Sequence, residues 1–407
     1  MGKPVFNFEK ILYFLFWLSF FLPRHGQLFL LMATCVLFFL KYFEHKPQKL
    51  RLNQWQMLWL GCSFLLFVFY LFYWPGAGAE EKKLLGTFLE QKLALILIPV
   101  AMIALKKRTP FELLRYAVFF VFVNIIHGLV TNFYLIAQQG ITLFNHHVNY
   151  RESFERATQI HPTYYGMYLV FSQIILLYMV TRMHRLWYIF FHLFIAILLL
   201  ILSPKIAILT SLVVWLFYGI NMRKNGIQFM YRPLILSVVI LLTASWFIPV
   251  TRQRIIEACS FIGISKPVED NSLMYRQLIL KVDQQMIKES GIWGLGPVTL
   301  EKKLKASYDY ISFLTMKPMG FYNTHNEYIN QWLLFGWMGL LVYLAYLIIP
   351  VYLSIRTGNW SYLSVDLILI LFGLTENYLS RQYGILFTTM VGTVFLLEVR
   401  TKEPFVL

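Results

Sequence analysis

Long apolar runs separated by short polar connections are the feature that most restricts how this chain can fold. A run of about 20 apolar residues is long enough to cross a bilayer as a helix. We place such runs at 8–22, 27–42, 54–74, 93–105, 113–136, 162–181, 187–202, 206–221, 234–250, 328–353, 364–379 and 384–399. The sequence therefore predicts an all-α, polytopic membrane protein of about twelve transmembrane helices.

The composition supports this class and excludes a soluble enzyme with a single anchor. Of the 407 residues, 58% are apolar, 18% are aromatic and only 14% are charged. A soluble fold cannot bury that much apolar surface. The cysteines, Cys35, Cys62 and Cys259, are odd in number, so they indicate neither a disulfide framework nor a redox compartment.

The net charge of +16 comes from 36 Lys and Arg against 20 Asp and Glu. With the N-terminus in the cytoplasm, the short basic connections all fall on the cytoplasmic side, at 41–51, 106–108, 182–185, 223–232, Arg356 and 400–402. This bias predicts an even number of spans with both ends inside, although two short runs, 93–105 and 364–379, also allow about ten or eleven. The basic residues then contact anionic membrane lipids, and they give no reason to expect nucleic acid as a partner.

One outer connection, Thr251 to Glu327, is much longer than the others. Within it, Tyr275, Ile279, Val282 and Met286 recur at helical spacing before Ser290-Gly291, which predicts an amphipathic helix on the membrane surface. We therefore divide the chain into 1–250 with roughly nine transmembrane helices, 251–327 as the outer loop, and 328–407 with the remaining helices and a cytoplasmic tail.

Polar side chains at membrane depth are costly, so each is a candidate site residue. The candidates are Arg115, Asn124, His127, Asn132, His192, Asp366, Glu376 and Asn377. Pairing across helices or a place at the interface is the structural alternative for most of them. Glu376 is the strongest candidate, because Thr375, Asn377, Arg381 and Gln382 gather with it at the outer end of a span, where it can pair with cations.

The most specific local pattern is Thr324-His325-Asn326, followed by Gly336-Trp337-Met338-Gly339. It opens the run 328–353 at the end of the long outer connection. Two glycines at this spacing allow close approach of helices, which would hold His325 against neighbouring spans. On periodicity alone, a structural histidine at the interface is the more common explanation.

The pattern His-Asn-x9-Gly-x-x-Gly from His325 to Gly339 resembles the signature of the O-antigen ligase and polymerase superfamily of bacterial polysaccharide enzymes. The resemblance extends to the number of spans and to one large periplasmic loop before the motif. Ser272 to Arg276, the helix after it and Gly294-Leu295-Gly296-Pro297 are similar to the family's loop segment. The resemblance implies a multi-pass protein of the bacterial inner membrane with its active site facing the periplasm.

The resemblance also implies roles for individual residues. His325 takes the place of an essential histidine and Arg276 that of an essential loop arginine. A second arginine of the family is replaced here by Lys205, in Leu202-Ser203-Pro204-Lys205. A lysine keeps the positive charge but cannot bind a phosphate in the bidentate geometry of arginine. The structural alternative is that Lys205 only extends its ammonium group to the membrane interface. We also predict supporting roles for Asn326, Tyr275, Glu376, Arg381 and His161, of which Glu376 and Arg381 follow from their position at the outer end of a span. His161 begins the motif His161-Pro162-Thr163-Tyr164-Tyr165. The structural alternative to a functional role is that this motif only starts a helix, with Pro162 in the first turn.

Enzymes of this family transfer a glycan from an undecaprenyl-diphosphate donor to an acceptor hydroxyl. Departure of the diphosphate requires a metal or fixed cations. Glu269-Asp270 is the closest acidic pair in the outer loops, so we expect no metal and no cofactor, although His146-His147 leaves a metal alternative open. Our hypothesis is that His325 acts as general base while Arg276 and Lys205 hold the diphosphate, in a single inverting displacement.

We predict that the acceptor is the lipid A-core, which makes the chain an O-antigen ligase. A polymerase or a protein O-oligosaccharyltransferase of the same superfamily is the alternative. A transporter of polysaccharide or lipid, with Arg115, Asp366 and Glu376 as a coupling path, is the alternative from another class. Transporters usually have two halves with corresponding interrupted helices, and this sequence shows no such symmetry.

Overall fold

The computed structural model describes residues 8–41, 43, 52–108, 114–145, 147–179, 183–224, 272–315 and 323–398, with isolated residues between 239 and 256. The helices are α1 (Phe8–Leu18), α2 (Arg24–Lys41), α3 (Gln54–Leu71), α4 (Ala79–Lys92), α5 (Ala94–Arg108), α6 (Val118–Gln139), α7 (His147–Thr158), α8 (Pro162–Tyr178), α9 (Arg185–Leu202), α10 (Lys205–Lys224), α13 (Ser272–Ser290), α14 (Pro297–Thr315), α15 (Glu327–Thr357), α16 (Trp360–Gly373) and α17 (Gln382–Glu398). Short 3-10 helices lie at η1 (Ser19–Phe21), η2 (Ile141–Asn145) and η3 (Tyr378–Ser380). The described residues contain no strand, so the all-α class is confirmed.

Four helical stretches are long and apolar enough to cross a membrane, at Gln54–Leu71, Ala79–Lys106, Val118–Gln139 and Glu327–Thr357. Shorter apolar helices cover Gly26–Lys41, Leu186–Leu202, Lys205–Tyr218, Trp360–Gly373 and Gln382–Glu398. These helices agree with a membrane protein. Each predicted run overlaps a helix except 234–250, which lies outside the described residues apart from isolated positions, and the run 364–379 extends beyond α16, which ends at Gly373. A total of about twelve spans stays a prediction.

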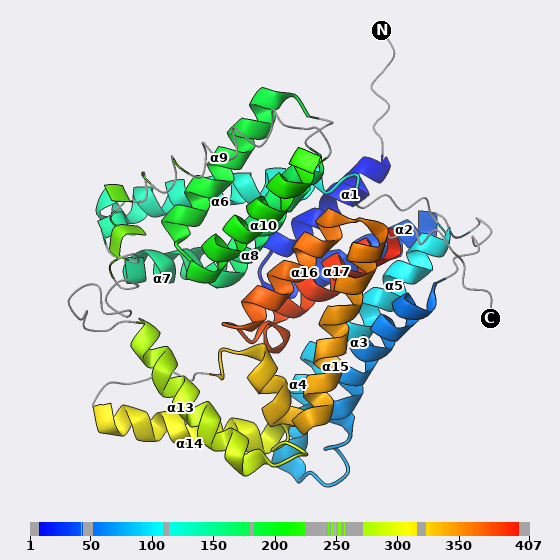
Figure 1. Cartoon of the computed structure of the whole chain (residues 1–407), viewed down its shortest axis with the longest axis vertical. Coiled ribbons are helices and arrows are strands. Elements are labelled where there is room, and N and C mark those ends of the chain that lie inside the picture. The colour runs from blue at the N-terminus through cyan, green and yellow to red at the C-terminus, as the bar shows by residue number, and fades with distance from the viewer. Residues whose placement is uncertain are drawn as a thin grey trace.

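Most of the apolar helices gather in one bundle, and α13 and α14 lie at one end of it, near α4 and α15 (Figure 1). The bundle core is rich in aromatic rings from helices far apart in sequence. Tyr168 of α8, for example, contacts Phe20 of η1 and Phe387 of α17, with ring centroids 5.6 and 5.8 Å apart. Every side chain of α8 from Pro162 to Leu177 is buried, which makes α8 a central helix.

The helix predicted in the long connection is confirmed as α13, which is followed by Gly291 in a left-handed conformation with φ of 60°, and its position on the membrane surface stays a prediction. The helix α14 was not expected from the sequence. The two helices share an apolar cluster with α3 and α15, formed by Tyr70, Ile279, Met286, Leu300, Leu304, Tyr308, Leu333, Leu334 and Phe335. The segment that carries Arg276 is therefore packed against the helix that follows His325.

A kink in α15 explains the glycine pattern of the motif. Phe335 and Gly336 have non-helical dihedral angles, and the turn between α13 and α14 fills the gap with backbone hydrogen bonds. Leu295 N donates to Leu333 O at 2.7 Å, Gly296 N donates to Leu334 O at 3.1 Å, and Trp337 N donates to Ile292 O at 3.0 Å. The carbonyl groups that a kink leaves without helical partners are thereby satisfied.

The expected close approach of spans at these glycines is wrong. Gly336 has φ of 62°, and a Cβ there would clash with the carbonyl oxygen of Ile292. Gly339 faces the backbone of its own helix across the kink, because a Cβ would lie 2.6 Å from Gln331 O. Gly336 thus admits the turn between α13 and α14, and Gly339 permits the kink within α15.

Asp283 of α13 is an unusual buried acid, which gives a stability prediction. The residue is 1% exposed, and neither carboxylate oxygen has a hydrogen-bond partner among the described residues. Burial raises the pKa of Asp283 from 3.8 to about 8, so the folded state holds this proton more tightly and stability falls as the pH rises through that window. We expect Asp283→Asn to be more stable at pH 7 by about 4 kcal/mol, measured as a higher melting temperature in detergent micelles.

The exposed residue Asp309 of α14 provides the matched control. Asp309→Asn should change the melting temperature little at any pH. The gain in Asp283→Asn should vanish below about pH 4, where the acid is protonated in both states. A variant less stable than the wild type at neutral pH would show that Asp283 is stabilised in its charged form.

Candidate active site

The segment before α15 holds His325 outside the helix. Asn326 is the N-cap residue, and its side-chain oxygen accepts a hydrogen bond from Ile329 N at 3.0 Å. Thr324 Oγ1 accepts a hydrogen bond from Asn377 Nδ2 at 2.8 Å, which ties the segment to the connection after α16. His325 itself is left-handed with φ of 46°, a conformation that histidine tolerates better than most residues.

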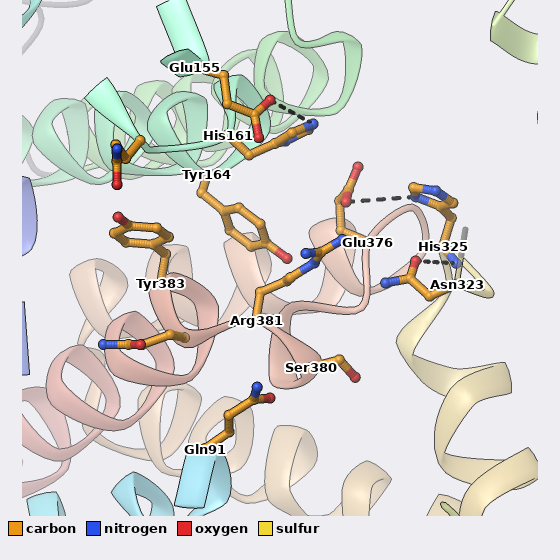
Figure 2. Close-up of a pocket in the computed structure, with 12 residues that line it drawn as sticks. Gln91, Glu155, His161, Tyr164, Asn323, His325, Glu376, Ser380, Arg381 and Tyr383 are labelled. Carbon is orange, nitrogen blue, oxygen red and sulfur yellow. Dashed lines mark hydrogen bonds and ion pairs between the residues drawn. The ribbon is translucent and has the colours of Figure 1, made fainter. Parts of the chain in front are cut away.

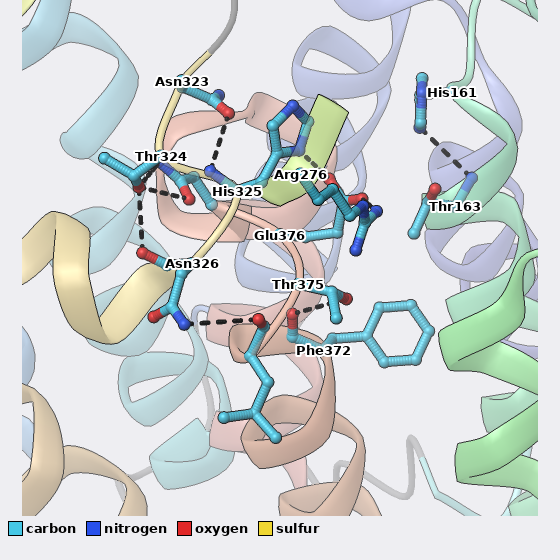
Figure 3. Close-up of polar contacts among 12 residues, drawn as sticks. His161, Thr163, Arg276, Asn323, Thr324, His325, Asn326, Phe372, Thr375 and Glu376 are labelled. Atoms are coloured by element: carbon cyan, nitrogen blue, oxygen red, sulfur yellow. Dashed lines mark hydrogen bonds and ion pairs between the residues drawn. The ribbon is translucent and has the colours of Figure 1, made fainter. Parts of the chain in front are cut away.

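Glu376 joins segments that are far apart in sequence (Figure 3). Its Oε1 accepts a hydrogen bond from Arg276 Nη2 at 3.5 Å, and its Oε2 lies 3.8 Å from His325 Nδ1. The Glu376 side chain is 8% exposed, against 41% for Arg276 and 27% for His325. The expected pairing of Glu376 with cationic residues is therefore confirmed, although the residue lies in the connection after α16 and not inside a span.

The charge of Glu376 is fixed by its neighbours. Burial alone would raise its pKa, but the adjacent rings of His325 and His161 and the guanidinium group of Arg276 favour the ionised carboxylate and lower the pKa to about 2. Glu376 is therefore ionised at neutral pH. A buried carboxylate between a histidine and an arginine can orient the imidazole ring and anchor the guanidinium group.

A cavity of about 240 Å³ opens beside this group. It is lined by Gln91, Glu155, Gln159, His161, Tyr164, Asn323, His325, Glu376, Ser380, Arg381, Gln382 and Tyr383. Figure 2 shows Arg381 and Glu376 between His161 on one side and His325 on the other. Two imidazoles and a guanidinium thus face one polar cavity, which suits the binding of a hydroxylated, anionic substrate.

His161 lies on the wall opposite His325. It is the N-cap residue of α8, with Pro162 in the first turn, so the structural explanation of this segment holds and the residue also lines the cavity. Its Nε2 lies 4.0 Å from Glu155 Oε2. Burial lowers the pKa of His161 to about 4, although Glu376 acts in the opposite direction, so the ring is neutral at neutral pH.

Glu327 is a buried residue of this region that was not expected from the sequence. Its carboxylate accepts hydrogen bonds from Gln331 Nε2 at 2.8 Å, Asn330 Nδ2 at 3.2 Å and Leu379 N at 2.9 Å. It therefore fixes η3, and with it the neighbouring Arg381, to the first turn of α15. An acidic residue directly after His325-Asn326 and at the start of an apolar run was the available signal.

Two of the predicted residues are not brought into this group. Lys205 is the first residue of α10 and follows Pro204 and Ser203, of which Ser203 has a left-handed backbone conformation. Lys205 lines neither this cavity nor the one described below. Tyr275 lies in the first turn of α13, and its side chain lies outside the described residues. Their roles stay predictions from the resemblance.

The structural alternative accounts for several polar residues within the bundle. Asn124 donates a hydrogen bond to Ser172 Oγ at 2.9 Å, and Asn132 donates to Gly128 O at 2.7 Å. Asp366 accepts from Ser354 Oγ at 3.2 Å. None of the three lines the cavity beside His325. Within the described part of the chain, no group of three or more His, Cys, Asp or Glu could hold a metal ion, and His146 lies outside that part.

Comparison with known families assigns this arrangement to a class. Residues 188–344 match the family model described as O-antigen ligase, a stretch that contains both Arg276 and His325. The chain thus carries an O-antigen ligase family domain, and the recognition made from the His325 motif is confirmed. The domain indicates a membrane enzyme that catalyses glycosyl transfer of the ligase or polymerase type. No curated protein matches the chain.

Replacement of Glu376 by glutamine should remove a pH-dependent part of the stability. Because the pKa is lowered from 4.5 to about 2, this contribution is fully present above pH 4.5 and is lost as the pH falls towards 2. We expect Glu376→Gln to be less stable than the wild type by about 3 kcal/mol at pH 7 and equally stable near pH 2, measured by melting temperature. Glu152→Gln is the control, because its ion pair with Arg156 is exposed and contributes little. A stability difference that did not shrink in acid would contradict the assignment.

Proposed function

We propose that this chain is an O-antigen ligase, which transfers a glycan from undecaprenyl diphosphate to a hydroxyl of the lipid A-core. The observation that carries the proposal is that Glu376 contacts Arg276 and lies next to His325, beside a cavity lined by His325, Glu376 and Arg381, within a chain that has an O-antigen ligase family domain. The family implies a lipid-linked glycan as donor and a lipid as acceptor in general. The lipid A-core and undecaprenyl diphosphate are the specific pair that we propose.

In the proposed reaction, the acceptor oxygen forms a bond to the anomeric carbon of the donor glycan. The bond from that carbon to the diphosphate breaks, and the carrier leaves as undecaprenyl diphosphate with the electron pair. His325 takes the proton of the acceptor hydroxyl, and ionised Glu376 orients the imidazole and stabilises its protonated form. One displacement of this kind inverts the anomeric configuration.

The diphosphate requires cations near the breaking bond. Arg276 is 41% exposed while it contacts Glu376, so its guanidinium group remains accessible to an anion. Arg381 lines the cavity directly and supplies a second planar guanidinium group. We assign these two arginines to the diphosphate, and Lys205 keeps the role implied by the resemblance. In this proposal no metal or cofactor is required.

The proposed orientation places both termini in the cytoplasm and the cavity at the periplasmic face of the inner membrane. The segment 251–327 is then a periplasmic loop between the spans of 1–250 and those of 328–407. The basic connections at 41–51 and 106–108 support this orientation, because Lys and Arg accumulate in cytoplasmic loops. Accessibility of an introduced cysteine on α13 to a membrane-impermeant reagent in intact spheroplasts tests it.

A transfer assay in proteoliposomes tests the function. Purified chain is mixed with glycan-linked undecaprenyl diphosphate and lipid A-core, without ATP and without an ion gradient. We expect glycan-modified lipid A-core and free carrier diphosphate as products. Growth of the carrier-linked glycan without modified lipid A-core would identify a polymerase, and uptake that depends on an ion gradient would identify a transporter.

A further inference from the structure

A second cavity of about 210 Å³ adjoins the first. It lies among α4, α14 and the start of α15, and it shares Gln91, Asn323, Ser380 and Arg381 with the cavity beside His325. The reaction described above requires one hydroxyl and one diphosphate at His325. It gives no role to the second cavity, which nevertheless opens onto the same polar residues.

The lining of the second cavity combines groups suited to a sugar. Asn330, Asn377 and Ser380 offer amide and hydroxyl groups, which can both donate to and accept from sugar hydroxyls. Tyr70 and Phe88 line another part of the wall, and aromatic rings pack against the apolar C–H face of a pyranose. Polar groups at a few fixed points on a partly apolar wall are typical of a small-molecule site.

Lys92 adds an unusual charge to this lining. The residue is 3% exposed, and its Nζ has no hydrogen-bond partner within the described part of the chain. The nitrogen lies 5.6 Å from the centre of the Tyr70 ring. A buried ammonium group without an acceptor is costly, so a hydrogen-bonding anion that enters the cavity would be stabilised strongly.

The nearby buried acid does not supply the missing acceptor. Glu327 balances the charge of Lys92 through space, but its oxygens accept hydrogen bonds from Gln331, Asn330 and the backbone of Leu379. Glu301 also lines the cavity and can accept a hydrogen bond from a hydroxyl. With Arg381 present as well, the wall holds two cations and one accessible carboxylate.

We propose that the second cavity binds an anionic sugar unit, a pyranose that carries a carboxylate or a phosphate, with Lys92 contacting the anionic group. The proposal rests on the proposed function in that this sugar belongs to the donor glycan or to the acceptor oligosaccharide. Bound beside Asn323 and Arg381, the unit positions the rest of its chain in the cavity of His325. Lys92 is thus a specificity-determining residue, and it takes no part in the proton transfer.

Binding of glucuronate, with glucose as the neutral probe, tests the proposal without any transfer reaction. The purified full chain in detergent micelles is titrated with each sugar, and apparent affinity is taken from the rise of the melting temperature. We expect glucuronate to bind roughly tenfold more tightly than glucose, as one charge-assisted hydrogen bond provides. Lys92→Met should lose this preference, while Lys83→Met, on an exposed lysine of the same helix, should keep it. Equal binding of the two sugars by the wild type overturns the proposal.

Two further variants keep the test decisive. If Lys92→Met alone fails to fold because Glu327 loses its balancing charge, the double variant Lys92→Met with Glu327→Gln removes both charges and should also lose the preference. Arg276→Ala should retain it, because that residue lies outside the second cavity. A preference that disappears in Arg276→Ala and persists without Lys92 would place the recognition of charge at the diphosphate site and overturn the proposal.

Steady-state transfer then identifies which substrate carries the anionic sugar. In Lys92→Met, a raised KM for the lipid acceptor with an unchanged KM for the donor assigns the sugar to the acceptor, and the reverse assigns it to the donor. If neither KM changes, the cavity does not serve the reaction and the proposal fails. A wild-type chain without transfer activity would instead refute the proposed function and leave the binding result standing.

Discussion

Replacement of His325 by asparagine should lower kcat for glycan transfer by about 10²- to 10⁴-fold, the usual loss when a general base is removed. Asparagine is the informative substitution because His325 has φ of 46°, and asparagine tolerates this left-handed conformation while alanine does so less readily. The amide also retains some polarity beside Glu376, so the local fold should persist. The KM for the donor should change little, since the arginines that hold the diphosphate are untouched.

The control for this experiment is His184→Asn. His184 is the N-cap residue of α9, where its ring accepts a hydrogen bond from Leu186 N at 3.4 Å, and asparagine is a favourable residue at that position. The variant should retain transfer activity. If a correctly inserted His325→Asn protein transferred glycan at the wild-type rate, His325 would not be the base.

Replacement of Gly336 by alanine should destabilise the chain by at least about 4 kcal/mol, an exceptional loss for one methyl group. Gly336 lies at φ of 62° in the kink of α15, which is strained for any residue with a Cβ. The added carbon would also clash with the carbonyl oxygen of Ile292, a backbone atom that cannot move away like the end of a side chain. We expect loss of the α13–α14 turn from α15, seen as low yield of monodisperse protein and as new protease cleavage near Gly291.

Two other glycines separate the contributions to this effect. Gly358 has φ of 66° with open space around it, so Gly358→Ala measures the strain alone and should cost about 1 to 2 kcal/mol. Gly61 lies within α3 with nothing nearby, so Gly61→Ala should be neutral or slightly stabilising. Equal stability of Gly336→Ala and Gly358→Ala would show that the docked turn contributes nothing.

The helices and the residues of the His325 motif could be predicted from the sequence. Apolar runs correspond to the observed helices because the cost of exposing backbone polar groups in lipid favours helices over other structures. The amphipathic helix Ser272–Ser290 followed from the spacing of its apolar residues. Glu376 was also identified, since an acid at the end of an apolar run stands out against its surroundings.

The sequence alone did not reveal how these pieces meet. The glycines at Gly336 and Gly339 were expected to face another span, but the pattern Gly-x-x-Gly reports only small size, and the partner of a small residue depends on tertiary packing. Glu327 and Lys92 were missed for the same reason, because they lie at the ends of apolar runs and look like interface residues. Their burial arises only when α4, α15 and η3 pack together.

The sequence by itself determined the class of protein and singled out His325 as the candidate base, because hydropathy and motif spacing are local properties of the chain. The tertiary structure alone decided which charges share a cavity. It brings Glu376 to Arg276, 100 positions away in the sequence, leaves Lys205 outside the cavity lining and places Arg381 within it. Electrostatic interactions depend on distance and burial in space, and neither quantity can be obtained from positions along the sequence.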